Sequence, residues 1–63
     1  MKLTIGKKLR KLRGDKSRLE VSKALGISVS AITMYELDKR TPRDDIKQKI
    51  AKYYKKSIES IFF

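Results

Sequence analysis

The sequence predicts an all-α fold, a compact bundle of four to five short helices that spans residues 1–63 as a single domain. Its apolar residues recur at spacings of three and four, which is the period of an α-helix and not of a β-strand. Serines and threonines precede these apolar segments at positions where they can cap a helix. Glycines follow the first two segments, where a helix has to end. Repeated starts and stops therefore divide the chain into short helices.

Length and composition exclude several classes of protein. A chain of 63 residues buries only about 60% of its unfolded surface, so its stability is marginal. It has no cysteine and no histidine, so disulfides, metal sites and nucleophile–base pairs lack their usual residues. We expect no catalytic residue, metal, cofactor or small-molecule ligand. No run approaches the roughly 20 apolar residues of a membrane span, and we expect a cytoplasmic location.

The net charge favours a polyanionic partner. Seventeen lysines and arginines stand against seven aspartates and glutamates, which gives a formal charge of +10. A charge of this size on so small a body attracts nucleic acid. The alternative is a solvated basic surface that has no partner.

The first helix is expected to be amphipathic. It opens at Thr4 or Lys2 and ends at Gly14, the glycine that follows the last apolar residue. Its apolar residues fall at i, i+4 and i+7, and they are Ile5, Leu9 and Leu12. Lysines and arginines fill the other faces, so the apolar side points into the core.

The second helix begins at a capping box. Ser17 can accept the backbone N–H of Glu20, whose carboxylate can in turn accept the backbone N–H of the serine. The apolar residues of its inward face are Val21, Ala24 and Leu25. Gly26 follows, and a left-handed backbone costs a glycine nothing, so the helix stops at Leu25.

A third helix follows after one short turn, over residues 28–37. Ser28 can cap it, and the apolar residues Ala31, Ile32 and Tyr35 keep the helical spacing. Two helices joined by such a turn can place the second helix in the major groove of DNA. The same geometry occurs in proteins that bind no DNA, so the residue types have to decide.

The residue types across these two helices carry a resemblance. Counted from Arg18, an apolar residue stands fourth, a small one fifth, glycine ninth, a β-branched one fifteenth and a bulky apolar one eighteenth: Val21, Ser22, Gly26, Ile32 and Tyr35. This pattern resembles the lambda-repressor-like family of helix-turn-helix regulators, which includes phage repressors, Cro and XRE-type proteins. The resemblance implies sequence-specific binding of double-stranded DNA by a transcriptional regulator, by default a repressor that occupies its operator. The alternative is a protein–protein interaction module of the same fold.

The resemblance also implies a structural pair and an unusual turn. Arg13 matches an arginine that pairs with a glutamate at the end of the recognition helix, here Glu36. The alternative for this pair is two solvated side chains. Asp38 stands where the family has glycine, so we expect a left-handed backbone there and a negative charge close to the DNA phosphates.

The outward face of the third helix carries no charge, although the chain is strongly basic. Ser30 and Thr33 can hydrogen-bond to base edges, and Val29 and Met34 offer apolar surface to the methyl group of thymine. We therefore predict that these four side chains contact bases. None of them is arginine, asparagine or glutamine, so we expect modest specificity and a preference for thymine-rich positions.

Contacts to DNA phosphates are expected from three sources. In the family, the position of Arg18 usually holds a phosphate-contacting glutamine, and a basic segment follows the recognition helix. The helix N-termini at Ser17 and Ser28 also offer backbone N–H groups. The predicted phosphate contacts are Ser17, Arg18, Ser28, Lys39, Arg40 and Arg43. The alternative for each cation is a solvated side chain.

The fourth helix is expected to follow a proline. Thr41 can cap it and Pro42 can take its first position, which suits proline because the missing N–H has no partner there. Asp44 and Asp45 then lie in the first turn, where negative charge complements the helix dipole. The lysines expected in its last turn are Lys52, Lys55 and Lys56.

A brief fifth helix is expected over residues 57–63, and it ends in two phenylalanines. An exposed Phe62 or Phe63 would mark a surface for a second copy of the chain. A domain of this size covers one half-site, so we expect a homodimer, at least on DNA. Its copies would read half-sites about 34 Å apart in an imperfect palindrome.

Overall fold

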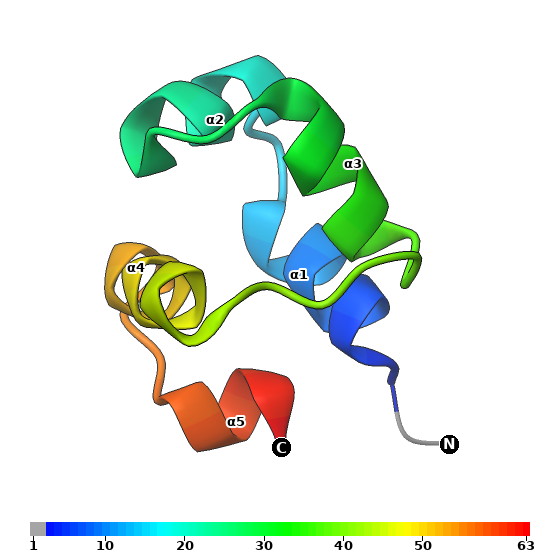
Figure 1. The fold of residues 1–63 in the computed structure, drawn as a ribbon, viewed down its shortest axis with the longest axis vertical. Helices are drawn as coiled ribbons and strands as arrows, with labels where there is room; N and C mark the ends of the chain where they lie inside the picture. The colour runs from blue at the N-terminus through cyan, green and yellow to red at the C-terminus, as the bar shows by residue number, and fades with distance from the viewer. Residues whose placement is uncertain (1–2) are drawn as a thin grey trace.

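The computed structural model describes residues 3–63 and folds them into five α-helices without a strand (Figure 1). The helices are α1 (Ile5–Arg13), α2 (Arg18–Leu25), α3 (Val29–Glu36), α4 (Asp44–Tyr54) and α5 (Ile58–Phe62). The predicted all-α fold is confirmed, and α2 and α3 form the helix-turn-helix. Lys2, one of the two expected starts of the first helix, lies outside the described residues.

Side-chain caps begin four of the helices. In each of the four, a hydroxyl oxygen accepts the backbone N–H three residues later, at 3.0 to 3.2 Å. The capping residues are Thr4, Ser17, Ser28 and Ser57. Gly14 and Gly26 follow α1 and α2 with positive φ angles of 58° and 69°. The residues at these helix ends therefore determine the ends locally.

The fourth helix begins later than the sequence predicts. The prediction that Thr41 and Pro42 open it is wrong, because α4 begins at Asp44 and its N-cap is Arg43, with φ −69° and ψ 164°. Residues 40–43 form a non-helical segment that crosses the molecule from the end of α3 to α4 (Figure 1). An extended chain covers about 3.3 Å per residue, against about 1.5 Å in a helix. A helical turn in this segment would shorten the crossing.

The fourth helix also ends earlier than predicted. Tyr54 is its last residue, and Lys55 is a left-handed C-cap with a φ of 57°. Of the three lysines expected in the last turn, only Lys52 lies there, and Lys55 and Lys56 follow the helix. The two aspartates predicted for the first turn are confirmed in that place.

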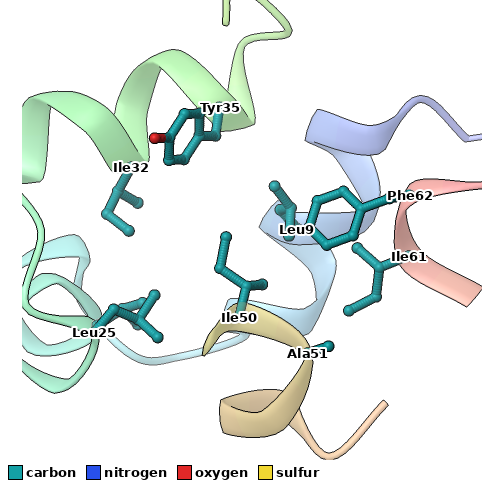
Figure 2. Close-up of a cluster of buried hydrophobic side chains, with 9 residues drawn as sticks. Leu9, Leu25, Ile32, Tyr35, Ile50, Ala51, Ile61 and Phe62 are labelled. Carbon is teal, nitrogen blue, oxygen red and sulfur yellow. The ribbon is translucent and has the colours of Figure 1, made fainter. Parts of the chain in front are cut away.

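The hydrophobic core draws side chains from all five helices (Figure 2). Its buried residues are Leu9, Val21, Leu25, Ile32, Tyr35, Ile50, Ala51, Ile61 and Phe62. α1 packs against α3 and α5, and α2 packs against α3 and α4. Ala24, which the pattern places on the inward face of α2, is exposed. Phe62 is buried whereas Phe63 is 81% exposed, so of the two phenylalanines Phe63 presents most of its side chain to a partner.

Gly6 allows the backbones of α1 and α3 to touch, a contact that the helical pattern does not predict. A Cβ atom at this position would lie 2.8 Å from the carbonyl carbon of Glu36 and from the carbonyl oxygen of Tyr35, and closer still to the Glu36 oxygen. Gly6 is buried in α1. The start of α1 therefore packs directly against the last turn of α3, and this contact fixes the position of α3 relative to α1.

Candidate nucleic-acid interface

α3 has a buried face and an outward face. Ile32 and Tyr35 turn into the core (Figure 2). On the other side, Val29 and Met34 are 39% and 38% exposed, and the C-cap Leu37 is 53% exposed. A group of large apolar side chains at a surface is typical of a contact site. Together with Ser30 and Thr33, these three residues form what we call the outward face of α3.

The two hydroxyl groups of this face differ in what they can bind. Thr33 is half-buried, and its Oγ1 donates to the carbonyl oxygen of Val29 at 3.0 Å. While this bond is made, the Thr33 hydroxyl offers only its acceptor lone pairs to a further partner. Ser30 is exposed, and its hydroxyl can donate and accept.

The turn between α2 and α3 is closed by backbone hydrogen bonds. Gly26 is left-handed, with φ 69° and ψ 31°, and its N–H donates to the carbonyl oxygen of Ser22. The N–H of Ile27 donates to the same oxygen at 3.1 Å. Ser22 is buried, and its hydroxyl donates to the carbonyl of Leu19 at 2.8 Å. A small, satisfied side chain at this point lets α3 lie close to α2, and the closed turn fixes the direction of α3.

A buried ion pair ties the end of α1 to the end of α3. Arg13 Nε lies 2.7 Å from Glu36 Oε2, and Arg13 Nη2 donates to Oε1 at 3.1 Å. The remaining nitrogen, Nη1, donates to the carbonyl oxygen of Lys16 at 2.7 Å. The two side chains are 10% and 4% exposed, and the hydrogen bond to Glu36 raises the pKa of Arg13 above its usual value. This is the bidentate geometry that guanidinium and carboxylate groups favour.

A second arginine reaches the same carboxylate. Arg18, the first residue of α2, donates from Nε to Glu36 Oε1 at 3.2 Å. Its side chain is 38% exposed, against 10% for Arg13. Three helices therefore meet at Glu36, and only the arginine of α2 reaches well into solvent. The sequence analysis predicts a phosphate contact for Arg18 and not this bond to Glu36, which joins residues 18 positions apart on different helices.

Asp38, which follows the C-terminus of α3, caps the start of α1. Its backbone is left-handed, with a φ of 59°, as its place in the family pattern predicts. Its Oδ1 accepts the N–H of Gly6 at 2.8 Å. Hydrogen bonds from Thr4 and from the backbone of Gly6 lower the pKa of this carboxyl below its usual value. The negative charge that we expected near phosphates thus faces the N-terminus of α1, where a carboxylate is favourable.

The predicted phosphate-contacting residues lie at different places around α3. Lys39 and Arg40 follow its C-terminus, whereas Arg43 lies across the molecule at the start of α4, and all three are exposed. No ion pair joins any of these three to a carboxylate within residues 3–63. The hydroxyls of Ser17 and Ser28 serve as helix caps. Each capping oxygen accepts a backbone N–H, so the hydroxyl proton of each serine stays available to a phosphate, beside the backbone N–H groups of the two N-termini.

Comparison with known proteins agrees with this architecture. A family model described as helix-turn-helix matches residues 7–61, a range that includes both α2 and α3. No curated protein and no solved structure matches the chain. No helix within the described part of the chain is long and apolar enough to cross a bilayer.

Proposed function

Because the chain belongs to the Cro/C1-type helix-turn-helix family of DNA-binding transcription regulators, we propose that it is a cytoplasmic repressor that binds a specific double-stranded DNA operator. Residues 1–63 act as one DNA-binding domain, and α3 enters the major groove. Occupancy of the operator then blocks transcription. The observation that carries this proposal is the uncharged outward face of α3 in a chain of net charge +10.

The outward face of α3 reads the bases. Ser30 donates to or accepts from base edges, whereas Thr33 offers acceptor lone pairs while its hydroxyl donates to the carbonyl of Val29. Val29 and Met34 place apolar surface against thymine methyl groups. This face has no arginine or amide for bidentate readout, so direct specificity is modest and thymine-rich half-sites are preferred.

Cations and helix N-termini beside α3, together with one arginine at the start of α4, bind the phosphates. The proposed contacts are the N-termini at Ser17 and Ser28 and the side chains of Arg18, Lys39, Arg40 and Arg43. Arginine suits this task because its planar fork matches the oxygens of a phosphate. Each phosphate that is neutralised releases counterions, so the affinity for DNA falls as salt rises.

Two copies of the chain cover one operator, which is an imperfect palindrome. Phe63 and Leu3 are 81% and 45% exposed, and they line one surface hollow together with Phe62 and Lys8. An apolar patch of this kind suits a second copy of the chain. Each copy carries a charge of +10, so repulsion opposes the homodimer in solution and DNA phosphates relieve it.

The second candidate is a protein interaction module of the same fold. The observation that favours it is the exposed apolar surface of Val29, Met34 and Leu37. A partner bound through this surface would be held by burial of apolar area, which responds little to salt.

A titration of a mixed-sequence DNA duplex separates the two candidates. Neutralising about four phosphates predicts an affinity loss of about a hundredfold between about 50 and 200 mM salt. Ser30→Glu places a negative charge on the outward face of α3 and should weaken binding by at least about tenfold, because the carboxylate meets DNA. The fold should persist, since a glutamate in the first turn of a helix is favourable.

The matched control for this titration is Gln48→Glu, which makes the same change in charge at an exposed position of α4. It should weaken binding far less than Ser30→Glu. Affinity that is independent of salt, or equal losses in the two variants, would favour the interaction module and speak against DNA binding through α3.

A further inference from the structure

Two arginines bind the carboxylate of Glu36, although one is enough to neutralise its charge. Arg13 alone supplies two N–H groups to it, at 2.7 and 3.1 Å, and the third nitrogen of Arg13 is held by a backbone carbonyl. This pairing neutralises the buried charge and joins α1 to α3. The additional bond from Arg18, at 3.2 Å, therefore calls for a role beyond neutralisation.

Only one of the three guanidinium nitrogens of Arg18 binds within residues 3–63. Its Nε donates to Glu36, and within residues 3–63 no hydrogen bond engages its two terminal nitrogens. The side chain of Arg18 is 38% exposed, whereas that of Glu36 is 4% exposed. Two guanidinium groups and one carboxylate leave one net positive charge on this cluster. The exposed arginine presents that charge to solvent, with N–H groups of its fork left for an anion.

We propose that Glu36 is a positioning residue for DNA binding: it holds the Arg18 guanidinium at the start of α2 so that the terminal nitrogens meet a DNA phosphate. This inference rests on the proposed function, because it assumes that the chain binds DNA. A free arginine side chain loses rotamer freedom when it binds. Fixing the side chain beforehand lowers that cost and raises the affinity for the phosphate.

Replacing Glu36 by glutamine changes the affinity for DNA in opposite directions under the two explanations, positioning of Arg18 and net charge alone. The substitution removes one negative charge and raises the net charge from +10 to +11. If charge alone mattered, DNA would bind more tightly. Positioning predicts the opposite, an affinity loss of about tenfold, which is the size expected for one charge-assisted hydrogen bond.

The experiment is a double-mutant cycle on the affinity for a DNA duplex. It compares wild type, Glu36→Gln, Arg18→Gln and the double variant at one salt concentration. The temperature is one at which circular dichroism shows every variant to be folded. We expect Glu36→Gln to weaken binding about tenfold in the wild-type background and not at all in the Arg18→Gln background. A purely structural role for Glu36 would not depend on the residue at position 18.

Arg18→Lys gives an independent measurement that leaves the Arg13 pair intact. Lysine keeps the charge but has no second nitrogen with which to hold Glu36 while binding a phosphate. We expect it to bind DNA about tenfold more weakly than wild type. Wild-type affinity for Arg18→Lys, tighter binding by Glu36→Gln, or equal effects of Glu36→Gln in both backgrounds would overturn the inference alone. Absence of DNA binding by the wild type would overturn the proposed function as well.

Discussion

Replacing Gly6 by alanine is expected to destabilise the fold by about 3 kcal/mol, the upper end of the usual cost of an overpacked site. The added Cβ atom would lie within 2.8 Å of backbone atoms of Glu36 and Tyr35, and a backbone cannot swing aside as a flexible side chain does. Helix propensity acts in the opposite direction, because alanine is favoured over glycine inside a helix by about 1 kcal/mol. The sign of the change in the free energy of unfolding therefore shows which effect is larger.

Urea denaturation followed by circular dichroism measures this change. The matched control is Lys7→Ala, at the exposed neighbouring position of α1, where we expect a change within about 0.5 kcal/mol. A Gly6→Ala protein as stable as the wild type would mean that α1 and α3 do not share a backbone contact.

Replacing Glu36 by alanine is expected to cost about 3 kcal/mol too, because it leaves a largely buried guanidinium without its counter-charge. Arg13, only 10% exposed, would lose both of its bonds to the carboxylate. A core of this size rarely supplies more than about 3 to 5 kcal/mol, so the alanine variant would be close to unfolding. Glu36→Gln keeps the shape and one acceptor oxygen, and it should cost about 1 kcal/mol.

Thermal melting of these variants tests the claim that Glu36 ties the helices together. Glu59→Ala removes the same charge from an exposed position in α5 and should cost less than about 1 kcal/mol, the value of a carboxylate near a helix N-terminus. If Glu36→Ala and Glu59→Ala melted at the same temperature, the ion pair would not stabilise the fold.

Most helix ends could be predicted from the sequence because local bonds determine them. Ser17 and Ser28 cap α2 and α3 with their own hydroxyl groups, and the left-handed Gly26 ends α2. Such signals act over three or four residues, so a pattern along the chain contains all the information needed. The helical period likewise predicts which residues of α3 share a face.

The start of α4 shows where local signals lose to the tertiary structure. Thr41 and Pro42 have the residue types of a helix start, yet the chain has to cross from α3 to α4 at this point. The distance to be covered keeps residues 40–43 non-helical (Figure 1). No local pattern contains that distance.

Three features around the candidate interface depend on contacts between distant parts of the chain. Gly6 touches the end of α3, Asp38 caps α1, and Arg18 shares the carboxylate of Glu36 with Arg13. The glycine inside a helical pattern was the one available signal, since an isolated glycine in a helix often marks close packing. The roles of the aspartate and the second arginine required the helices to be placed relative to one another.

Selection of bound duplexes from a random pool tests whether the outward face of α3 reads DNA bases. The wild type should enrich one motif with two related, thymine-rich half-sites. The double variant Ser30→Ala, Met34→Ala keeps the cations and should still bind DNA, but with the preference lost or changed at the positions that these side chains contact. An unchanged motif in the variant, or no motif with the wild type, would contradict the account.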